Sequence, residues 1–203
     1  MNLPLGLSVP HAGLLVPDEL AGNCLLTEAQ IKADGDVGAA AIYDLAEHVV
    51  RWQTTEIARA VLDMNRGQDD VRKDGIVKTH TCWDEPVWRE SLTDLQVSDL
   101  LVRFHRPYHL GLAGFGAVTK LGVDCHTMAA HGPPVGPDSG QRRPLVCLGN
   151  GAGQSCPRSW IEALRDCFVA ALGDDVTINK PFAGGFITRS HGREMPWVQI
   201  ELS

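Results

Sequence analysis

Two histidines and one aspartate have the residue types and sequence surroundings of a metal-binding site. His11 follows the apolar run Leu5 to Val9, and His126 follows the apolar run Leu121 to Cys125. Asp36, in the segment Lys-Ala-Asp-Gly-Asp, adds a carboxylate. Two neutral imidazoles and one carboxylate would leave a fourth position on a tetrahedral zinc ion open for water. No short motif joins the three residues, so the site depends on a fold that brings them together.

The elements that must position these residues alternate between strands and helices. Short apolar runs predict strands at Leu5 to Val9, Arg59 to Met64, Leu121 to Cys125, Pro144 to Leu148, Val176 to Ile178, Phe186 to Thr188 and Trp197 to Leu202. Helical spacing predicts helices at Gly38 to Trp52, at Thr93 to Lys120 with an interruption at Pro107, and at Trp160 to Leu172.

Strands that alternate with helices predict an α/β fold, with a mixed, mostly parallel central sheet covered by helices on both faces. Sites in such sheets form at the carboxyl ends of the strands. His11, Asn65-Arg66 and Asp124-Cys-His126 each follow or end a predicted strand. We therefore expect these segments to meet at one edge of the sheet.

The composition favours one globular domain spanning residues 1–203. Hydrophobic residues make up 44% of the 203 residues, and no Ser/Gly/Pro-rich linker divides the chain. The net charge of -7 argues against binding to nucleic acid or to anionic membranes, and no apolar run is long enough for a membrane span. The N-terminus has no signal-peptide pattern, so we expect a cytoplasmic protein whose six cysteines stay as free thiols.

Five blocks along the chain resemble the N-formylglutamate amidohydrolase family, and they occur in the order typical of that family. They are Ser8-Val-Pro-His-Ala-Gly13, Leu62-Asp-Met-Asn-Arg66, Asp124-Cys-His-Thr-Met128, Asn179 to Ile187 with His191-Gly192, and Val198-Gln-Ile-Glu-Leu202. The resemblance covers residues 8 to 202, which is nearly the whole chain. It implies a three-layer α/β/α domain similar in fold to zinc carboxypeptidases and aspartoacylases.

The resemblance also implies the chemistry. His11, Asp36 and His126 would hold one zinc ion per chain, and Glu201 would activate the metal-bound water. Asn65 and Arg66 would bind the carboxylate of a small N-acyl amino acid such as N-formyl-L-glutamate. These roles agree with the residue types, because zinc lowers the pKa of its water to about 7 and an arginine fork matches a carboxylate.

Other residues near these blocks allow more than one role. We expect Asp124 to orient a histidine rather than to bind the metal directly. Arg189 would be either a second carboxylate-binding residue or a solvated charge at a strand end, and Gly184-Gly185 either a tight turn or a close approach to substrate. Cys125 is a poor candidate for a nucleophile paired with His126, because adjacent strand residues point to opposite faces. Packing or surface roles, rather than metal binding, are expected for His105 and His109.

Three departures from the family pattern leave an alternative open. Asp36 is followed by Val-Gly-Ala-Ala-Ala, where the family has a stretch rich in carboxylates and histidine. Gly149 to Cys156 lacks the family's arginine, and the loop from Asp69 to Lys78 is short. The leading hypothesis is a zinc amidohydrolase, and the competing one is a non-catalytic binding domain of the same fold. Imidazole and carboxylate ligands would also accept cobalt, iron or nickel.

Overall fold

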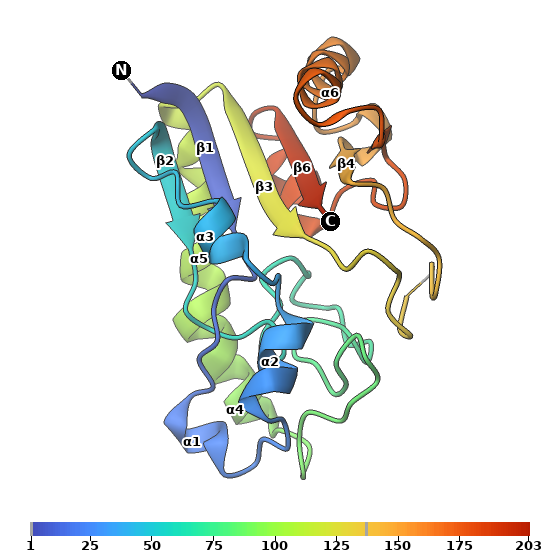
Figure 1. Ribbon diagram of the computed structural model, residues 1–203. Coiled ribbons are helices and arrows are strands. Elements are labelled where there is room, and N and C mark those ends of the chain that lie inside the picture. The colour runs from blue at the N-terminus through green and yellow to red at the C-terminus, as the bar shows by residue number, and fades with distance from the viewer. Residues whose placement is uncertain (1, 137) are drawn as a thin grey trace.

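A six-stranded mixed sheet forms the centre of the computed structural model, which describes residues 2–136 and 138–203 (Figure 1). The strands are β1 Leu3–Val9, β2 Val49–Thr54, β3 Leu121–Thr127, β4 Val146–Gly149, β5 Val176–Ile178 and β6 Trp197–Leu202. Their order across the sheet is β2-β1-β3-β6-β4-β5. The first four in this order are parallel to one another, whereas β4 is antiparallel to β6 and parallel to β5. The prediction of a mixed, mostly parallel sheet is confirmed.

Helices cover both faces of this sheet. The helices are α1 Asp18–Ala21, α2 Glu28–Asp34, α3 Ala39–Ile42, α4 Asp94–Leu100, α5 Arg106–Ala113, α6 Arg158–Leu172 and α7 Phe186–His191. A π-helical turn, Leu101–His105, joins α4 to α5, and short 3-10 turns lie at Phe115–Ala117 and Gly151–Gly153. Residues of α5 and α7 belong to one apolar core, and residues of α3 and α6 to a second on the opposite face. The expected three layers are therefore present.

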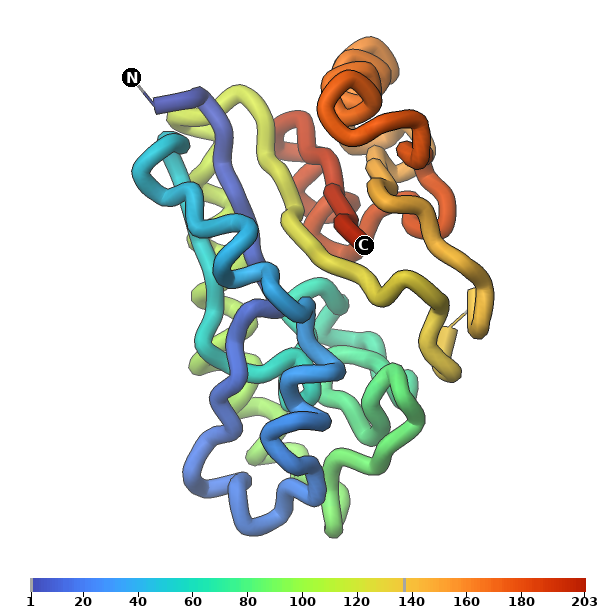
Figure 2. The backbone as a smooth tube through the Cα atoms, viewed as in Figure 1, coloured from blue at the N-terminus to red at the C-terminus, as the bar shows by residue number. Residues whose placement is uncertain are grey.

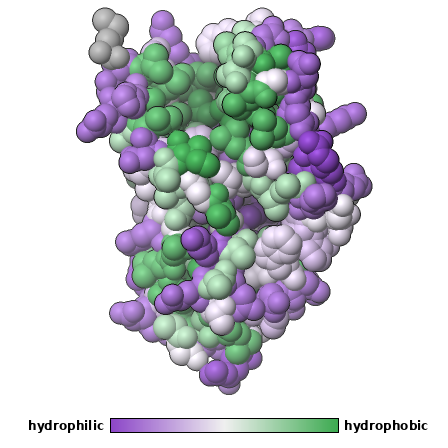
Figure 3. Space-filling view, viewed as in Figure 1, coloured by the Kyte–Doolittle hydropathy of each residue, from purple (hydrophilic) through white to green (hydrophobic). Residues whose placement is uncertain are grey.

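The strand alternation assigns each core to one face. Leu7, Val123 and Val198 point into the core under α3 and α6. Trp197, the residue before Val198 on β6, points the other way, toward α5 and α7. On the α3 and α6 face several apolar side chains are only partly buried, and Figure 3 shows apolar residues gathered over this part of the molecule.

The predicted helix from Gly38 to Trp52 is wrong in its second half. Only Ala39–Ile42 is helical, and Val49–Thr54 is strand β2, which pairs with β1 at the edge of the sheet. The β-branched and aromatic residues Val49, Val50 and Trp52 favour a strand, and this preference overrides the helical spacing.

Two predicted strands are also wrong. Arg59 to Met64 is irregular and held by turns such as Leu62 N–H to Ala58 O, although its apolar side chains are fully buried. Phe186 to Thr188 is the start of α7. A short buried apolar run does not distinguish a strand from a buried turn or a short helix, so only the packing decided these segments.

The helical prediction from Thr93 is confirmed as far as Ala113; Phe115–Ala117 is only a 3-10 turn, and the predicted last residues, up to Lys120, are not helical. Thr93 caps α4 and exchanges side-chain and backbone hydrogen bonds with Gln96. The helical segment continues through Pro107, whose missing N–H removes one intrahelical hydrogen bond, and the π-helical turn directly precedes it.

The long connections between elements lie past the carboxyl ends of β1 and β2, where α1, α2, α4 and the loops between residues 55 and 92 form the lower part of Figure 2. All six cysteines are free thiols, as expected. Every helix within residues 2–136 and 138–203 is too short or too polar to span a membrane.

Candidate metal centre

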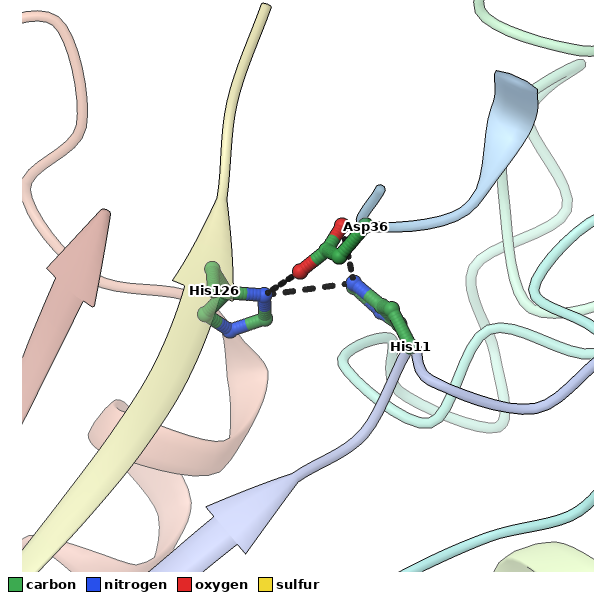
Figure 4. Close-up of side chains that lie close together, drawn as sticks. All are labelled: His11, Asp36 and His126. Atoms are coloured by element: carbon green, nitrogen blue, oxygen red, sulfur yellow. Dashed lines mark hydrogen bonds and ion pairs between the residues drawn. The ribbon is translucent and has the colours of Figure 1, made fainter. Parts of the chain in front are cut away.

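His11, Asp36 and His126 meet at the carboxyl ends of β1 and β3 (Figure 4). The Nδ1 atoms of His11 and His126 lie 3.2 Å apart. Asp36 Oδ1 lies 3.3 Å from His11 Nδ1, and Asp36 Oδ2 lies 2.9 Å from His126 Nδ1. All three side chains are buried. The structure thus brings together the three residues expected to bind a metal.

Local sequence features place each of these residues. Pro10 follows β1 and lacks the N–H that a further strand residue would use, so the chain turns at His11. A capping box between Thr27 and Gln30 starts α2, and the helix stops at Gly35, which leaves Asp36 at the entry of the next loop. The Asp36 amide then donates to His11 O at 3.2 Å, which ties this loop to the end of β1.

Carboxylates hold the outer nitrogen of each histidine. His11 Nε2 lies 2.8 Å from Asp63 Oδ1, and His126 Nε2 lies 3.1 Å from Asp124 Oδ2. A ring that donates its Nε2 proton to a carboxylate presents a bare Nδ1 on the opposite side, and this arrangement is common behind metal-binding histidines. Asp124 thus lies where an orienting carboxylate would. The sequence did not reveal that Asp63 lies behind His11 in the same way, although Asp63 belongs to the family-like block Leu62 to Arg66.

The donor set fits a divalent cation. With both Nε2 atoms donating, two imidazole lone pairs and the Asp36 carboxylate face one another. Nitrogen ligands at tetrahedral positions about 2.0–2.1 Å from zinc would lie about 3.3 Å apart, close to the observed separation of 3.2 Å. Burial would raise the pKa of Asp36, but His11 and His126, when they are protonated, lower it, so the carboxylate stays charged.

Glu201 lies beside His126, because the two residues are register partners on β6 and β3. Gln199 Nε2 donates to Glu201 Oε1 at 2.7 Å, and the Gly185 amide donates to Gln199 Oε1. Burial raises the pKa of Glu201 to about 7, against a lowering contribution from His126. A carboxyl group whose pKa lies near neutrality can both accept and return a proton at physiological pH.

Asn65 contacts the centre from the loop after Arg59–Met64. Its Nδ2 donates to Asp124 Oδ2 at 3.1 Å and lies 3.1 Å from His126 Nε2. Its Oδ1 accepts from the Ile187 amide at the start of α7. A Cβ on Gly185 would lie 2.2 Å from the Asn65 amide nitrogen, so Gly185 permits this close approach.

Arg66 lies next to Asn65, but its guanidinium is surrounded by acidic residues of its own chain. Arg66 NH2 lies 3.4 Å from Asp74 Oδ2, Nε lies 3.7 Å from Asp70 Oδ2, and NH1 lies 4.0 Å from Asp63 Oδ2. The side chain is 22% exposed. Any substrate carboxylate would compete with these groups for the same guanidinium.

The remaining residues singled out from the sequence lie in varied surroundings. Arg189 lies on α7 rather than at a strand end; it is exposed and donates to Gly184 O. Burial and the neighbouring Asp124 raise the pKa of the Cys125 thiol well above its ordinary value, which disfavours a nucleophilic thiolate. In the block Gly149 to Cys156, Asn150 exchanges hydrogen bonds with Asn179 where the family pattern has a charged residue.

A half-buried arginine near the centre, Arg59, was missed from the sequence. Arg59 Nε donates to Asp63 Oδ2 at 3.2 Å, and its NH1 lies 4.0 Å from Asp36 Oδ1. It thus links the carboxylate behind His11 to the carboxylate between the two histidines. The only sequence signal was a charged residue at the start of a run that is otherwise apolar.

Comparison with known proteins gives consistent matches. The family model described as N-formylglutamate amidohydrolase matches residues 3–203. An N-formylglutamate deformylase from Pseudomonas putida is 30% identical over 221 aligned positions, which cover 100% of this chain and 80% of that protein. The crystal structure of an N-formylglutamate amidohydrolase from Ralstonia eutropha JMP134 has a TM-score of 0.78 at 21% identity and covers 99% of this chain and 81% of its own. A gene product of Agrobacterium tumefaciens has a TM-score of 0.72 at 16% identity over 98% and 79% of the two chains. The two structures support the fold.

Proposed function

The chain belongs to the N-formylglutamate amidohydrolase family, and from this premise we propose that it is a zinc-dependent hydrolase that cleaves the amide bond of N-formyl-L-glutamate or a closely related N-acyl acidic amino acid. The convergence of His11, Asp36 and His126, with Glu201 beside them, carries the proposal. We further propose that residues 1–203 act as one catalytic domain, since the site combines residues from both ends of the chain.

Each residue has a role that follows from its surroundings. His11, Asp36 and His126 would hold the zinc ion, which when bound supplies an activated water and polarises the scissile carbonyl. Asp63 and Asp124 keep the two imidazoles oriented with Nδ1 toward the centre. Glu201 would take a proton from the attacking water and return it to the leaving amine, a task that suits its pKa of about 7.

Substrate orientation would fall to Asn65 and Arg66. The Asn65 amide is held against Asp124 and His126, so a substrate group bound there would lie next to the metal ligands. Arg66 would supply the positive charge for a substrate carboxylate. Arg189 is a second candidate for this charge, since it lies on α7, which begins directly after Gly185, the glycine that approaches Asn65.

The direct test is an assay of the purified full-length chain, stripped with a chelator and then supplied with Zn²⁺, Co²⁺, Fe²⁺ or Ni²⁺. Formate and glutamate released from N-formyl-L-glutamate are measured, with N-formyl-L-glutamine and N-acetyl-L-glutamate as comparison substrates. We expect metal-dependent turnover that is fastest with N-formyl-L-glutamate, and loss of both metal and turnover in His126→Ala. Binding of the substrate without turnover under any metal would favour the non-catalytic binding domain.

The role of Glu201 is tested by Glu201→Gln, which keeps the shape of the side chain and removes its ability to accept a proton. We expect the metal content per chain to stay unchanged and kcat to fall by about two to four orders of magnitude, the usual contribution of a general base. Gln199→Leu is the matched control, since it removes the hydrogen bond to Glu201 and leaves the carboxylate in place. A Glu201→Gln enzyme with kcat near that of the wild type would exclude this mechanism.

A further inference from the structure

Three histidines outside the metal centre form a contiguous cluster behind the segment that carries Asn65. His105 ends the π-helical turn, His109 lies on α5, and His191 ends α7. The ring centroids of His105 and His109 lie 4.3 Å apart, and those of His109 and His191 lie 5.3 Å apart in a stacked arrangement. None of these rings contacts His11, Asp36 or His126 in the described parts of the chain.

Two of these rings hold the backbone on both sides of Asn65. His109 Nε2 donates to Met64 O at 2.9 Å, and His105 Nε2 donates to Arg66 O at 2.9 Å. A carbonyl oxygen only accepts, so each ring must carry its proton on Nε2. The peptide that presents Asn65 is therefore fixed at both ends by donors from one helical face.

The protonation of His109 is set by the rest of the cluster. With Nε2 as its donor, its Nδ1 accepts from His191 Nε2 at 3.0 Å. His191 Nδ1 lies 3.0 Å from Glu194 Oε2 on the far side. Burial, together with His105 and His191, lowers the pKa of His109 to about 3, so the ring stays neutral near physiological pH.

Packing alone does not explain why a histidine occupies position 105. Its Nδ1 is buried and has no hydrogen-bond partner among the described residues. An apolar side chain would avoid the desolvation of this atom, because a buried polar atom without a partner is unfavourable. The feature that an apolar residue would not provide is the Nε2 donor to Arg66 O.

We propose that His105 and His109 are positioning residues, which hold the Met64 and Arg66 carbonyls so that the Asn65 amide stays against Asp124 and His126. Asn65 Nδ2 donates to Asp124 Oδ2 at 3.1 Å and Asn65 Oδ1 accepts from the Ile187 amide at 2.8 Å, so a small shift of its peptide would break both hydrogen bonds. The effect on turnover rests on the proposed function, whereas the positioning itself does not.

The test compares substitutions that keep or remove the donor. Glutamine Nε2 can occupy the place of histidine Nε2, so His109→Gln and His105→Gln retain a donor, whereas His109→Leu and His105→Leu remove it. Leu112→Ala is the control, because Leu112 is fully buried on α5 and its loss weakens the core without removing a hydrogen bond to segment 64–66. Zinc content, hydrogen exchange of residues 63–67, and kcat and KM are measured for every variant.

We expect both leucine variants to bind zinc normally and to exchange amide hydrogens in residues 63–67 several-fold faster. They should also lose up to about 10²-fold in kcat/KM, the size of effect that a misplacement of a substrate-orienting group by about 1 Å can have. The glutamine variants should recover most of the slow exchange and most of kcat/KM. Leu112→Ala should show neither faster exchange nor a lower kcat/KM at temperatures where it is folded. Equal exchange in the leucine and Leu112→Ala variants, or no recovery with glutamine, would overturn the proposal. If the wild type shows no turnover, the proposed function fails and the exchange measurement alone decides the positioning role.

Discussion

Arg66 lies among the carboxylates of Asp63, Asp70 and Asp74, at nitrogen–oxygen distances of 4.0, 3.7 and 3.4 Å. Asp74 also accepts from Arg66 Nε through its backbone oxygen. The positive charge of Arg66, the residue proposed to bind a substrate carboxylate, is thus already compensated by carboxylates of its own chain. Among the three acidic residues, Asp74 is the most exposed and has the shortest ion pair, so under the proposed function it is the group with which a substrate carboxylate would compete most directly.

We therefore expect Asp74→Asn to improve the binding of acidic substrates. Its ion pair is partly exposed and worth about 0.5–1 kcal/mol, so KM for N-formyl-L-glutamate should fall about twofold to fivefold. The matched control is Asp69→Asn, which makes the same change in net charge at an exposed residue of the same loop. Steady-state kinetics at low and high salt would measure both, and equal KM values for the two variants would show that Asp74 does not limit Arg66.

At the level of elements, a buried ion pair joins α2 to the loop that follows the Asn65–Arg66 segment. Lys78 Nζ lies 2.8 Å from Asp34 Oδ2, and both side chains are fully buried. Asp34 Oδ1 also accepts from the Cys82 amide, and Asp34 ends the helix that precedes Asp36. This ion pair therefore connects the irregular segment that contains Lys78 to the loop that carries Asp36, a candidate metal ligand.

Asp34→Asn should destabilise the protein strongly, because it keeps an acceptor for Cys82 but leaves the Lys78 ammonium buried without a counter-charge. Breaking a buried pair from one side typically costs about 3–5 kcal/mol. The free energy of unfolding in urea would measure this, with Asp84→Asn as the control, since the Lys73–Asp84 pair is exposed and 3.7 Å long. Adding Lys78→Met to Asp34→Asn should recover part of the loss, and a purely additive double variant would argue against the pair.

At the scale of the whole molecule, the cluster of His105, His109 and His191 connects the helical layer of α5 and α7 to the loop at the edge of the sheet. Burial lowers the pKa of both His105 and His109, and for His109 to about 3. The folded protein therefore binds a proton on His109 less tightly than the unfolded chain does. The stability linked to this ring is fully present above about pH 6.5 and is lost as the pH falls toward about 3.

The contribution of His109 to the free energy of unfolding of the metal-free protein should accordingly decrease between pH 7 and pH 5, whereas Glu201, whose pKa is raised to about 7, contributes in the opposite direction over the same range. One pKa unit corresponds to about 1.36 kcal/mol, so His109 alone contributes a loss of about 2 kcal/mol at pH 5. His109→Gln cannot take up a proton at this position, so the difference in free energy of unfolding between the wild type and His109→Gln should change by about 2 kcal/mol between pH 7 and pH 5, in the direction that disfavours the wild type at pH 5. The buried Asp63 has a pKa lowered below its ordinary value, so its stabilising contribution is lost only in a more acidic range. An identical pH dependence in the wild type and His109→Gln would contradict the neutral, buried state of this ring.

Local sequence determined a large part of this protein. The apolar runs that became β1, β3 and β6, the capped helix from Thr93 and the helix that became α6 were all predictable, because strand and helix preferences depend on neighbouring residues. The order of the five blocks identified the family. Pro10 after β1 was enough to expect that His11 turns toward the edge of the sheet.

Only the tertiary structure decided the remaining features. The segment Arg59–Met64 and α7 were predicted as strands because a buried apolar run looks the same whatever backbone it adopts. Three contacts could not be predicted, because each depends on how the loops fold. They are the contacts of Asp63 with His11, of Asp74 with Arg66 and of His109 with the Met64 carbonyl. The sequence reports which residues can carry charge or donate a hydrogen bond, whereas burial and distance, which set their pKa values and their partners, exist only once the chain has folded.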